Sequence, residues 1–471
     1  MKRLNISFLL AGLFLVALQA CKKPVDLFPT DFINEANVFQ TVNDLDQALL
    51  AAYGSWPGEN NMYFNAIVAD ETKISNENRG QGQFEFKWQY VADQGGATTS
   101  HWGHYINIGR INKALAAFDK VNARNPAEAT QKEQIRGQFL ALRALAHFEM
   151  LQVYSGRFVP TALGIPYTTT SDLGARPSRP TMAETIAGIE ADLLAAFNSP
   201  LANAPAASGT AGVIRISKSV VAGIRARVAL YKGNDWTNAA NFASDCITLS
   251  GRSLNTGAAF ANIWTDDDNP ASSELLWKIR RTGTSVGTLW QDNNGDVFFE
   301  PSDKLKALFN RTTDTRFNTF FLIDPTAQDT CLVRKFFTSA RGPKIVDVKL
   351  MRLSEMYLIR AEARAESNNL SGAAADYNLV RQNRITGYTN ETFVDKTDAI
   401  NKIYNERARE LCFEGFRFYD HVRRGLPIQR PASDVQSLEW QTLAADNFRF
   451  KFPIPGNSIR ANPNMVQNPG Y

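Results

Sequence analysis

Residues 406–425 read ERARELCFEGFRFYDHVRRG, a segment that is rich in both charged and aromatic residues. Opposite charges three residues apart meet on one face of a helix. The stretch offers four such pairs: Glu406/Arg409, Arg407/Glu410, Glu414/Arg417 and Asp420/Arg423. Apolar side chains between residues 411 and 418 lie among these charges, so part of the network should be buried. Buried Arg–carboxylate pairs fix register more than they add net stability, and we interpret these residues as structural rather than catalytic.

Two segments before this stretch have the pattern of helical hairpins. Residues 217–250 and 351–384 each place a small residue, Ala226 or Ala361, on the first helix and an Ala-Ala-x-aromatic sequence on the second. In both segments, the small residue and the Ala-Ala-x-aromatic sequence are the same distance apart along the chain. Small residues let antiparallel helices approach closely, which predicts packing of the tetratricopeptide type. Two unrelated helical hairpins are the alternative.

Helical periodicity also dominates the first half of the chain. Apolar residues recur at three- and four-residue steps over residues 102–121 and 128–154, which predicts two helices. Thr41 and Thr181 each precede a further periodic segment and are predicted to be helix N-caps. The sequence therefore predicts a scaffold built mainly from helices.

Two regions between these helices, residues 54–100 and 260–345, are rich in loops and aromatic residues. Loops of this length inside a compact domain are usually functional. A sugar site combines an aromatic face for the C–H side of the ring with polar groups for the hydroxyls. Six loop residues fit this composition and are predicted to bind ligand: Trp88, Tyr90, Trp264, Trp290, Asp292 and Asn293. The alternative is that each tryptophan fills the core, which is our interpretation of Trp102 at the start of a helix.

The N-terminus has the features of a lipoprotein signal. Lys2 and Arg3 precede an apolar run of about a dozen residues, which is too short to span ~30 Å of hydrocarbon but suits a signal sequence. The run ends in Leu-Gln-Ala-Cys21, which is similar to a lipobox, where the cysteine is acylated. We expect residues 1–20 to be the signal peptide, Cys21 to carry lipid such as palmitate, and residues 21–36 to form an extended tether. A secreted protein with a chance cysteine is the alternative.

Composition narrows the class of protein. The chain has 471 residues, of which 44% are hydrophobic and 21% charged, so it is long and apolar enough to form a large folded core. Its net charge of +4 gives no basic excess for nucleic acid, and we expect no nucleic-acid partner. Cys246, Cys331 and Cys412 have no metal or disulfide spacing, so buried free thiols are expected, with one disulfide as the alternative.

The motifs give little support to catalysis or metal binding. Residues 283–287 match G-x-S-x-G as a string, but that mechanism needs a strand before it, a helix after it, and an acid and a histidine downstream. The one downstream histidine is His421, inside the charged stretch, so we interpret the string as a loop. No catalytic residue, metal site or cofactor is predicted, except that Asp292, Asn294, Asp296 and Glu300 could gather around a loop calcium ion.

Matches along the chain resemble one protein family. Residues 21–29 (CKKPVDLFP) resemble the start of SusD/RagB-type outer-membrane lipoproteins, and residues 38–53 resemble their first helix. The stretch 406–425 is similar to their most recognisable segment. Residues 452–455 (FPIP) and 462–471 are similar to their C-terminus. The matches are in order and span nearly the whole chain, so together they are specific.

The resemblance implies a mostly α fold. A tetratricopeptide-like half of about four helix pairs would support an irregular, loop-rich half with short strands. The implied parts are a SusD-like N-terminal helical part at 37–255 and a RagB/SusD C-terminal part at 256–471, with a loop-rich insert at 256–348.

The resemblance also implies a function and a location. The protein would bind nutrient oligosaccharide without catalysis and deliver it to a TonB-dependent transporter barrel, acting as its extracellular lid. It would be anchored in the outer membrane, facing outside, through the N-terminal lipid only. The alternatives are a peptide-binding member of the same family, a surface-anchored glycoside hydrolase and a protein-interaction scaffold of helical repeats.

Overall fold

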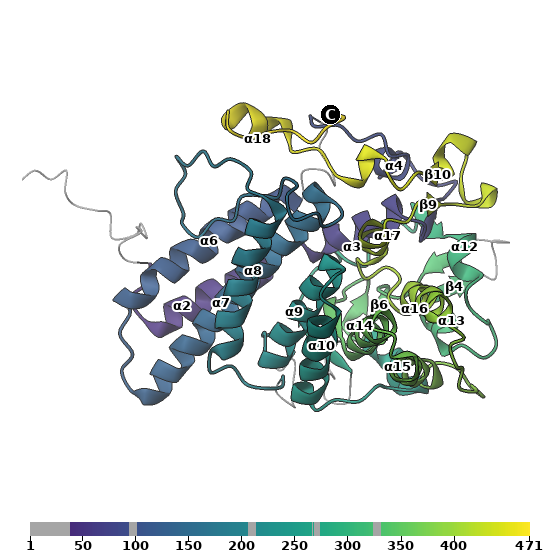
Figure 1. The fold of residues 1–471 in the computed structure, drawn as a ribbon, viewed down its shortest axis with the longest axis horizontal. Helices are drawn as coiled ribbons and strands as arrows, with labels where there is room; N and C mark the ends of the chain where they lie inside the picture. Colours follow the sequence, from purple (N-terminus) through teal and green to yellow (C-terminus); the bar gives the residue numbers. More distant parts are fainter. Residues whose placement is uncertain (1–37, 94–100, 206–212, 266, 268–273, 324–330) are drawn as a thin grey trace, which may run out of the picture.

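The computed structural model of the protein describes residues 38–93, 101–205, 213–265, 267, 274–323 and 331–471. Most elements are helices and the strands are short, which confirms the predicted fold class (Figure 1). The helices between residues 104 and 198 lie at one end of the molecule, the hairpin of residues 218–250 lies in the middle, and the helices between residues 315 and 410 lie at the other end. Residues 1–37 are outside the described chain, so the predicted signal peptide, Cys21 lipid site and tether remain predictions.

The early helices begin where the sequence places polar caps. Thr41 forms a capping box with Asp44, and Thr181 forms one with Glu184, as expected from their side-chain chemistry. The long helix of residues 126–155 starts with Asn125 as N-cap and a proline in its first turn. The helices of this part are α2 (Val42–Gly54), α3 (Gly58–Val68), α4 (Gln83–Phe86), α6 (His104–Ala117), α7 (Pro126–Ser155) and α8 (Met182–Asn198), with short 3₁₀ turns η2 (His101–Gly103) and η3 (Phe118–Lys120).

The two predicted hairpins form and pack on each other. The first consists of α9 (Lys218–Lys232) and α10 (Trp236–Ser250), and the second of α14 (Leu353–Glu366) and α15 (Leu370–Gln382). Helix α10 packs against α14, so the hairpins stack as in a tetratricopeptide array. Ala226 and Ala361 are fully buried. A Cβ at Gly223 of α9 would lie 2.5 Å from the sulfur of Met351, which shows how closely the first helix approaches its neighbours.

Short antiparallel strand pairs join distant parts of the chain. The longest pair is β2 (Leu275–Ile279) with β8 (Val348–Arg352), and β1 (Thr72–Ile74) pairs with β3 (Phe299–Pro301). The other pairs are β4 (Phe321–Ile323) with β5 (Cys331–Val333), β6 (Thr338–Ser339) with β7 (Gly342–Pro343), and β9 (Ile428–Gln429) with β10 (Thr442–Leu443). The remaining helices are α11 (Gly257–Thr265), α12 (Asp303–Lys306), α13 (Thr315–Phe320), α16 (Lys396–Glu410), α17 (Arg417–Arg424) and α18 (Gly456–Ala461), with 3₁₀ turns η4 (Ala432–Asp434), η5 (Leu438–Trp440) and η6 (Phe448–Phe450).

One main hydrophobic core unites the two ends of the molecule. It contains buried side chains from Val42 to Met465, and a smaller core lies between α14, α15 and α16. Residues on both sides of position 255 share the main core. The predicted boundary between an N-terminal and a C-terminal part at 255/256 therefore remains a prediction from the sequence. Cys246, Cys331 and Cys412 are buried free thiols, as expected. In the described chain no helix combines the length and the apolar character needed to cross a membrane.

The charged stretch 406–425 forms two helices rather than one. Helix α16 ends at Glu410 and α17 starts at Arg417, because Phe413 and Gly415 between them adopt positive φ angles of 62° and 88°. The expected pairs Glu406–Arg409, with nitrogen and oxygen 2.7 Å apart, and Asp420–Arg423, at 2.8 Å, are confirmed.

The other two expected pairs are wrong. Arg407 and Glu410 share α16, but arginines from other elements take the Glu410 carboxylate, and Glu414 lies before the first residue of α17. Arg407 pairs with Asp420 instead of Glu410, at 2.9 Å. Arg417 pairs with Asp70 at the end of α3, at 2.7 Å, instead of with Glu414. The charges therefore tie α17 to other elements of the fold rather than stabilising one helix.

Glu410 is the centre of a fully buried ion network. Its carboxylate lies 3.0 Å from the guanidinium of Arg316 in α13, 2.8 Å from Arg352 in β8 and 2.9 Å from Arg384 after α15. All four side chains have no exposed surface. Burial alone would raise the pKa of Glu410, but the three guanidinium groups hold it well below its ordinary value. Glu274 accepts from both Arg352 and Arg384, which adds a second carboxylate to balance the charge.

The central carboxylate gives a direct test of this network. Glu410→Gln keeps the size of the side chain but leaves buried arginines without a counter-charge, so we expect a loss of about 3–5 kcal/mol in the free energy of unfolding. Urea denaturation at pH 7 measures the change. Glu439→Gln, at an exposed position in η5, is the control and should change stability by less than about 0.5 kcal/mol. Equal effects of the two substitutions would contradict this account.

The network also predicts how stability depends on pH. Although burial raises the pKa of Glu406 and Asp420, the neighbouring arginines outweigh it and lower each pKa to about 2 in the folded protein. Their ordinary values are about 4.3 and 3.9, so the stabilisation is complete above about pH 4.5 and is lost as the pH falls toward 2. Glu71 acts in the opposite sense, because burial raises its pKa to about 8. The urea midpoint should therefore rise slightly between pH 7 and 4.5, as Glu71 becomes protonated, and should fall between pH 4.5 and 3, as the ion pairs of Glu406 and Asp420 are lost. A midpoint that is the same at pH 4.5 and 3 would contradict the prediction.

Candidate ligand-binding site

Trp88, which we predicted to bind ligand, is part of the core instead. Only 3% of its surface is exposed, and its indole Nε1 donates to the carbonyl of Val68 at 2.9 Å. The guanidinium carbon of Arg430 lies 4.3 Å from the Trp88 ring and 3.9 Å from the ring of Phe86. Arg430 donates in turn to the carbonyls of residues 67–69 at the end of α3. Trp88 therefore packs against the group that caps α3.

The other three predicted aromatic residues are also buried, so the expectation of exposed ring faces is wrong for them. Tyr90 packs on Phe452, with ring centroids 4.3 Å apart, and its hydroxyl donates to the carbonyl of Arg449. Trp264 and Trp290 are 1% and 4% exposed. The physical reason is that the loop-rich half has few helix pairs whose packed faces could form a core. Its large aromatic side chains form the core there instead.

Asp292 and Asn293 lie on the loop that follows Trp290, and their role in binding stays a prediction. Asn293 is exposed. The carboxylate of Asp292 accepts the backbone N–H groups of Asn294 at 2.8 Å and Asp296 at 2.9 Å, so it closes its own turn. Among the residues that the structure describes, no cluster of three or more His, Cys, Asp or Glu could hold a metal ion. The suggested calcium ligand Glu300 lies in β3, where it accepts the backbone N–H of Cys331.

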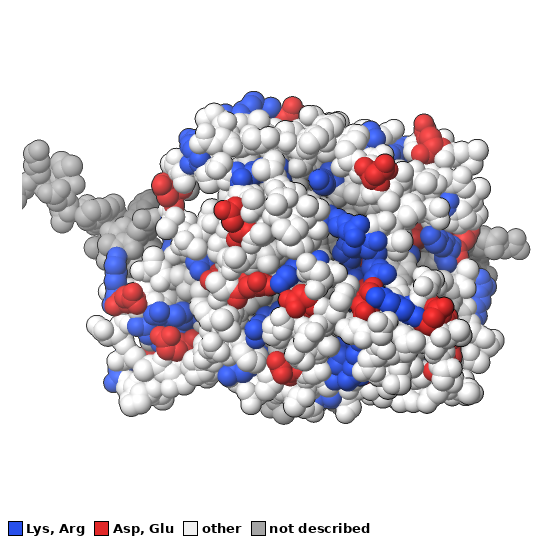
Figure 2. Space-filling view, viewed as in Figure 1, with Lys and Arg blue, Asp and Glu red and all other residues white. Residues whose placement is uncertain are grey.

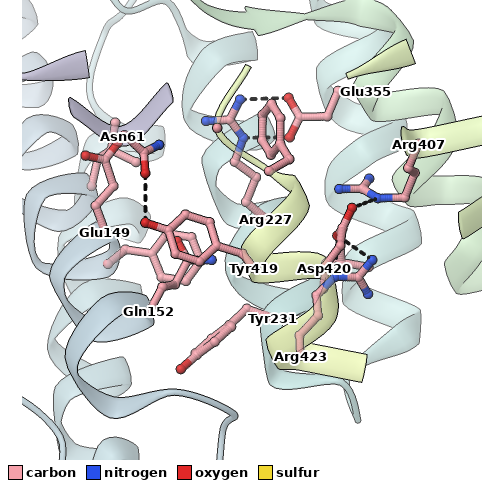
Figure 3. Close-up of a pocket in the computed structure, with 15 residues that line it drawn as sticks. Asn61, Glu149, Gln152, Arg227, Tyr231, Glu355, Arg407, Tyr419, Asp420 and Arg423 are labelled. Atoms are coloured by element: carbon pink, nitrogen blue, oxygen red, sulfur yellow. Dashed lines mark hydrogen bonds and ion pairs between the residues drawn. The ribbon is translucent and has the colours of Figure 1, made fainter. Parts of the chain in front are cut away.

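A small cavity lies beside α17, but it is too small for a sugar. Its volume is about 50 Å³, and ion pairs surround it: Arg227 with Glu355, and Asp420 with Arg407 and Arg423 (Figure 3). A cavity of this size and polarity has room for water. We interpret it as a part of the structural network rather than a binding site.

A surface groove beside Trp102 has the size and composition of a ligand site. This Trp102 groove has a volume of about 350 Å³ and lies between α6, the loop of residues 166–177 and α18. Trp102 and Tyr105 are half-buried, and their rings meet edge to face with centroids 5.0 Å apart. The opposite wall carries polar groups, which include Thr168, Thr170, Ser171, Asp172, Arg176, Ser458 and Asn462.

Hydrogen bonds from α6 and α7 hold the loop of residues 166–177 in place, and this loop forms one wall of the groove. The side-chain amide of Asn112 donates to the carbonyls of Thr168 and Thr170, each at 3.1 Å. His147 accepts the backbone N–H of Thr168 through Nε2 at 3.1 Å, and its Nδ1 donates to the carbonyl of Arg143 at 2.8 Å. Burial lowers the pKa of His147 to about 3, so the neutral ring keeps this arrangement at physiological pH. The hydroxyl of Tyr105 donates to the carbonyl of Pro166 at 2.8 Å.

The other end of the loop is held by the C-terminal segment. Asn462 donates to the carbonyl of Pro177 at 2.8 Å, and Arg179 donates to Asn468, also at 2.8 Å. The groove therefore joins parts of the chain that are far apart in sequence. Sequence reasoning missed it because Trp102 reads as an ordinary core residue, and its packing on Tyr154 agrees with that interpretation in part.

Substitution of Trp88 separates a core role from a binding role. Trp88→Ala should lower the free energy of unfolding by about 3–5 kcal/mol, because it removes a buried ring and the partner of Arg430. Chemical denaturation measures the loss. Trp236→Ala, at a half-buried position in α10, is the matched control and should cost less. Native stability of Trp88→Ala together with lost ligand binding would contradict the core assignment.

Two family models match the chain. The SusD family matches residues 330–471, and a SusD-like family described as "Starch-binding associating with outer membrane" matches residues 22–230. The starch-binding protein SusD of Bacteroides thetaiotaomicron is 33% identical over 126 residues, which are 26% of this chain and 22% of that protein. SusD-like protein P38 of Formosa agariphila is 21% identical over 529 residues, which cover 100% of this chain and 99% of the relative.

Solved structures agree with the fold over almost the whole chain. A SusD superfamily protein from Bacteroides thetaiotaomicron has a TM-score of 0.80 at 23% identity, with 91% of this chain and 100% of that chain covered. Surface glycan-binding protein A from Bacteroides uniformis has a TM-score of 0.74 at 18% identity, with 91% and 99% covered. The names of these relatives describe binding rather than catalysis, in agreement with the expectation that the chain is not an enzyme. Models of SusD-type families thus match this chain at both ends, over residues 22–230 and 330–471.

Proposed function

We propose that this protein binds oligosaccharide at the cell surface without cleaving it and passes it to a TonB-dependent transporter of the outer membrane, which it covers as an extracellular lid. The observation that carries the binding role is the Trp102 groove, an aromatic and hydroxyl-lined groove with fixed walls. The names of the relatives support a carbohydrate as the ligand, since they include a starch-binding protein and a surface glycan-binding protein.

The groove offers what a sugar ring needs. A volume of about 350 Å³ falls within the range of about 300–1,000 Å³ that small-ligand sites have. The half-buried rings of Trp102 and Tyr105 provide apolar surface for the C–H face of a sugar. Hydroxyl groups such as those of Ser171 and Ser458 are available for the sugar hydroxyls. Because the walls are already hydrogen-bonded in place, little ordering would be needed on binding.

The same groove does not suit glycoside hydrolysis. That reaction needs two carboxyl groups, about 5–9.5 Å apart, on either side of the scissile bond. Of the described residues that line the groove, Asp172 alone carries a carboxylate, and it accepts the backbone N–H of Gly174 at 2.8 Å. This composition favours binding over cleavage.

The anchor and the transporter complete the proposal. Acylation of Cys21 would hold the protein at the membrane, since membrane affinity grows by about 0.8 kcal/mol for each buried CH₂ of a lipid chain. The phrase "associating with outer membrane" in the description of the matching family supports this location. A helix-built body anchored by lipid at one end would lie above a barrel in the same membrane, which suits a lid.

A side chain added inside the groove tests the site without disturbing the core. Gly109 lies in α6, where a Cβ would meet just the Ser171 hydroxyl, at 4.0 Å. Gly109→Leu should therefore fold normally, because replacing a helix glycine is favourable by about 0.5–1 kcal/mol, but it should fill the groove. Isothermal titration with starch-derived and other neutral oligosaccharides should show binding by the natural protein and at least a tenfold loss in Gly109→Leu.

Gly54→Leu is the matched control, because a Cβ at Gly54 has no atom within 4 Å and this residue is outside the groove. It should bind like the natural protein. Chromatography of the saccharide after incubation should show it intact. Unchanged binding by Gly109→Leu would move the site elsewhere, and cleavage of the saccharide would support the hydrolase alternative.

A further inference from the structure

We propose that a second groove, on the other side of the same loop, binds the acidic groups of anionic oligosaccharides, such as those that carry uronate or sulfate. This basic groove has a volume of about 1,010 Å³ and lies between α2, α6 and residues 169–174. The inference rests on the proposed function in one respect: it takes an oligosaccharide as the ligand. It adds a chemical class of ligand and a second site.

Positive charge lines one side of the basic groove. Arg110 and Lys113 on α6 and Lys120 in η3 all contribute to its lining. Arg110 and Lys120 are exposed, and within the described chain neither has a carboxylate at ion-pair distance. Cations without partners in a concave surface attract anions and raise their local concentration.

The acidic groups nearby do not cancel this charge. Asp172 is the one carboxylate among the described lining residues, and it accepts the N–H of Gly174. Asp119, next to Lys120, pairs with Arg136 at 3.3 Å. Asp44 at the start of α2 accepts the N–H groups of Gln40 and Thr41, at 3.0 and 2.8 Å. The net charge of the groove is therefore positive.

The rest of the groove fits a sugar better than a lipid surface. Its floor is apolar, with Phe39, Ala48 and Ala116 among the lining residues, and this suits the C–H face of a sugar ring. Exposed hydroxyls of Thr169 and Thr170 stand on the loop side. A concave, hydroxyl-lined groove encloses a saccharide unit, whereas a bilayer surface would need a flat or protruding patch.

The two grooves share one wall. Thr170, Ser171, Asp172 and Leu173 contribute to both, so the loop separates a neutral aromatic site from a basic one. An oligosaccharide chain that crosses this loop can place neutral units beside Trp102 and an acidic unit beside Arg110. One face of the loop would therefore contact neutral sugar units, and the other face would contact an acidic unit.

The test compares a charged saccharide with its neutral counterpart on the full-length protein. Isothermal titration with oligogalacturonate and with its methyl ester should show the acid bound about three- to tenfold more tightly at 50 mM NaCl. The difference should disappear at 500 mM NaCl, because salt screens exposed charges. The double variant Arg110→Gln/Lys120→Gln should bind the acid and the ester equally and should keep the melting temperature of the natural protein.

The matched control removes two cations from a rival location. Arg157 and Lys451 line another groove, near α17, where Figure 2 shows basic side chains gathered, and they too have no ion pair among the described residues. Arg157→Gln/Lys451→Gln should leave the preference for the acid intact. Loss of the preference in this control, or its absence in the natural protein, would overturn the inference.

Two further results distinguish this inference from the proposed function. If the ester binds and Gly109→Leu blocks it, but the acid gains nothing, the proposed function stands and the basic groove fails. If neither saccharide binds, the proposed function fails first. Binding to vesicles of anionic phospholipid that needs Arg110 and Lys120, with no preference for oligogalacturonate, would overturn the inference in favour of a lipid surface.

Discussion

The contact of three arginines with the single buried carboxylate of Glu410 constrains the whole molecule. Arg316, Arg352 and Arg384 come from a short helix, a strand and the end of a hairpin, so the network forms only when these elements meet. Removing one partner from such a network is costly, whereas assembling it adds little net stability. Its role is therefore to specify one arrangement. This network also agrees with the break in the helix after Glu410. Helix α16 ends at this residue, inside the core, and α17 turns toward α3.

Two other arginines extend the same principle to the irregular half. Arg430 and Arg179 are buried with no carboxylate of the described residues at ion-pair distance, and they donate mainly to backbone carbonyls. Burial lowers the pKa of Arg179 to about 10 and of Arg430 to about 9, so both stay charged at physiological pH. Arg430 holds the end of α3, and Arg179 joins the loop before α8 to the C-terminal segment. A groove that can bind ligand without rearrangement follows from this fixed backbone.

Sequence reasoning succeeded where the signal is local. The caps at Thr41 and Thr181, the two hairpins with buried Ala226 and Ala361, and the free buried cysteines all depend on nearby residues. It failed where partners are remote. The segments around Trp88 and Trp290 have the composition of a sugar site, but both rings are buried in the core. No local pattern shows that Arg430, which is distant in sequence, packs on Trp88. The Trp102 groove was not predictable for the same reason, since α6, the 166–177 loop and α18 meet only in the fold.

These features describe a rigid, helix-supported body whose loop surface holds a saccharide and does no chemistry on it. A crystal structure of the protein with a bound neutral oligosaccharide tests this claim most directly. We predict an intact saccharide in the Trp102 groove, with a ring against Trp102 or Tyr105, hydroxyls bonded to the 168–177 loop, and Trp88 and Trp290 still buried. A cleaved saccharide, or one stacked on Trp88 or Trp290 after the core has opened, would contradict the account.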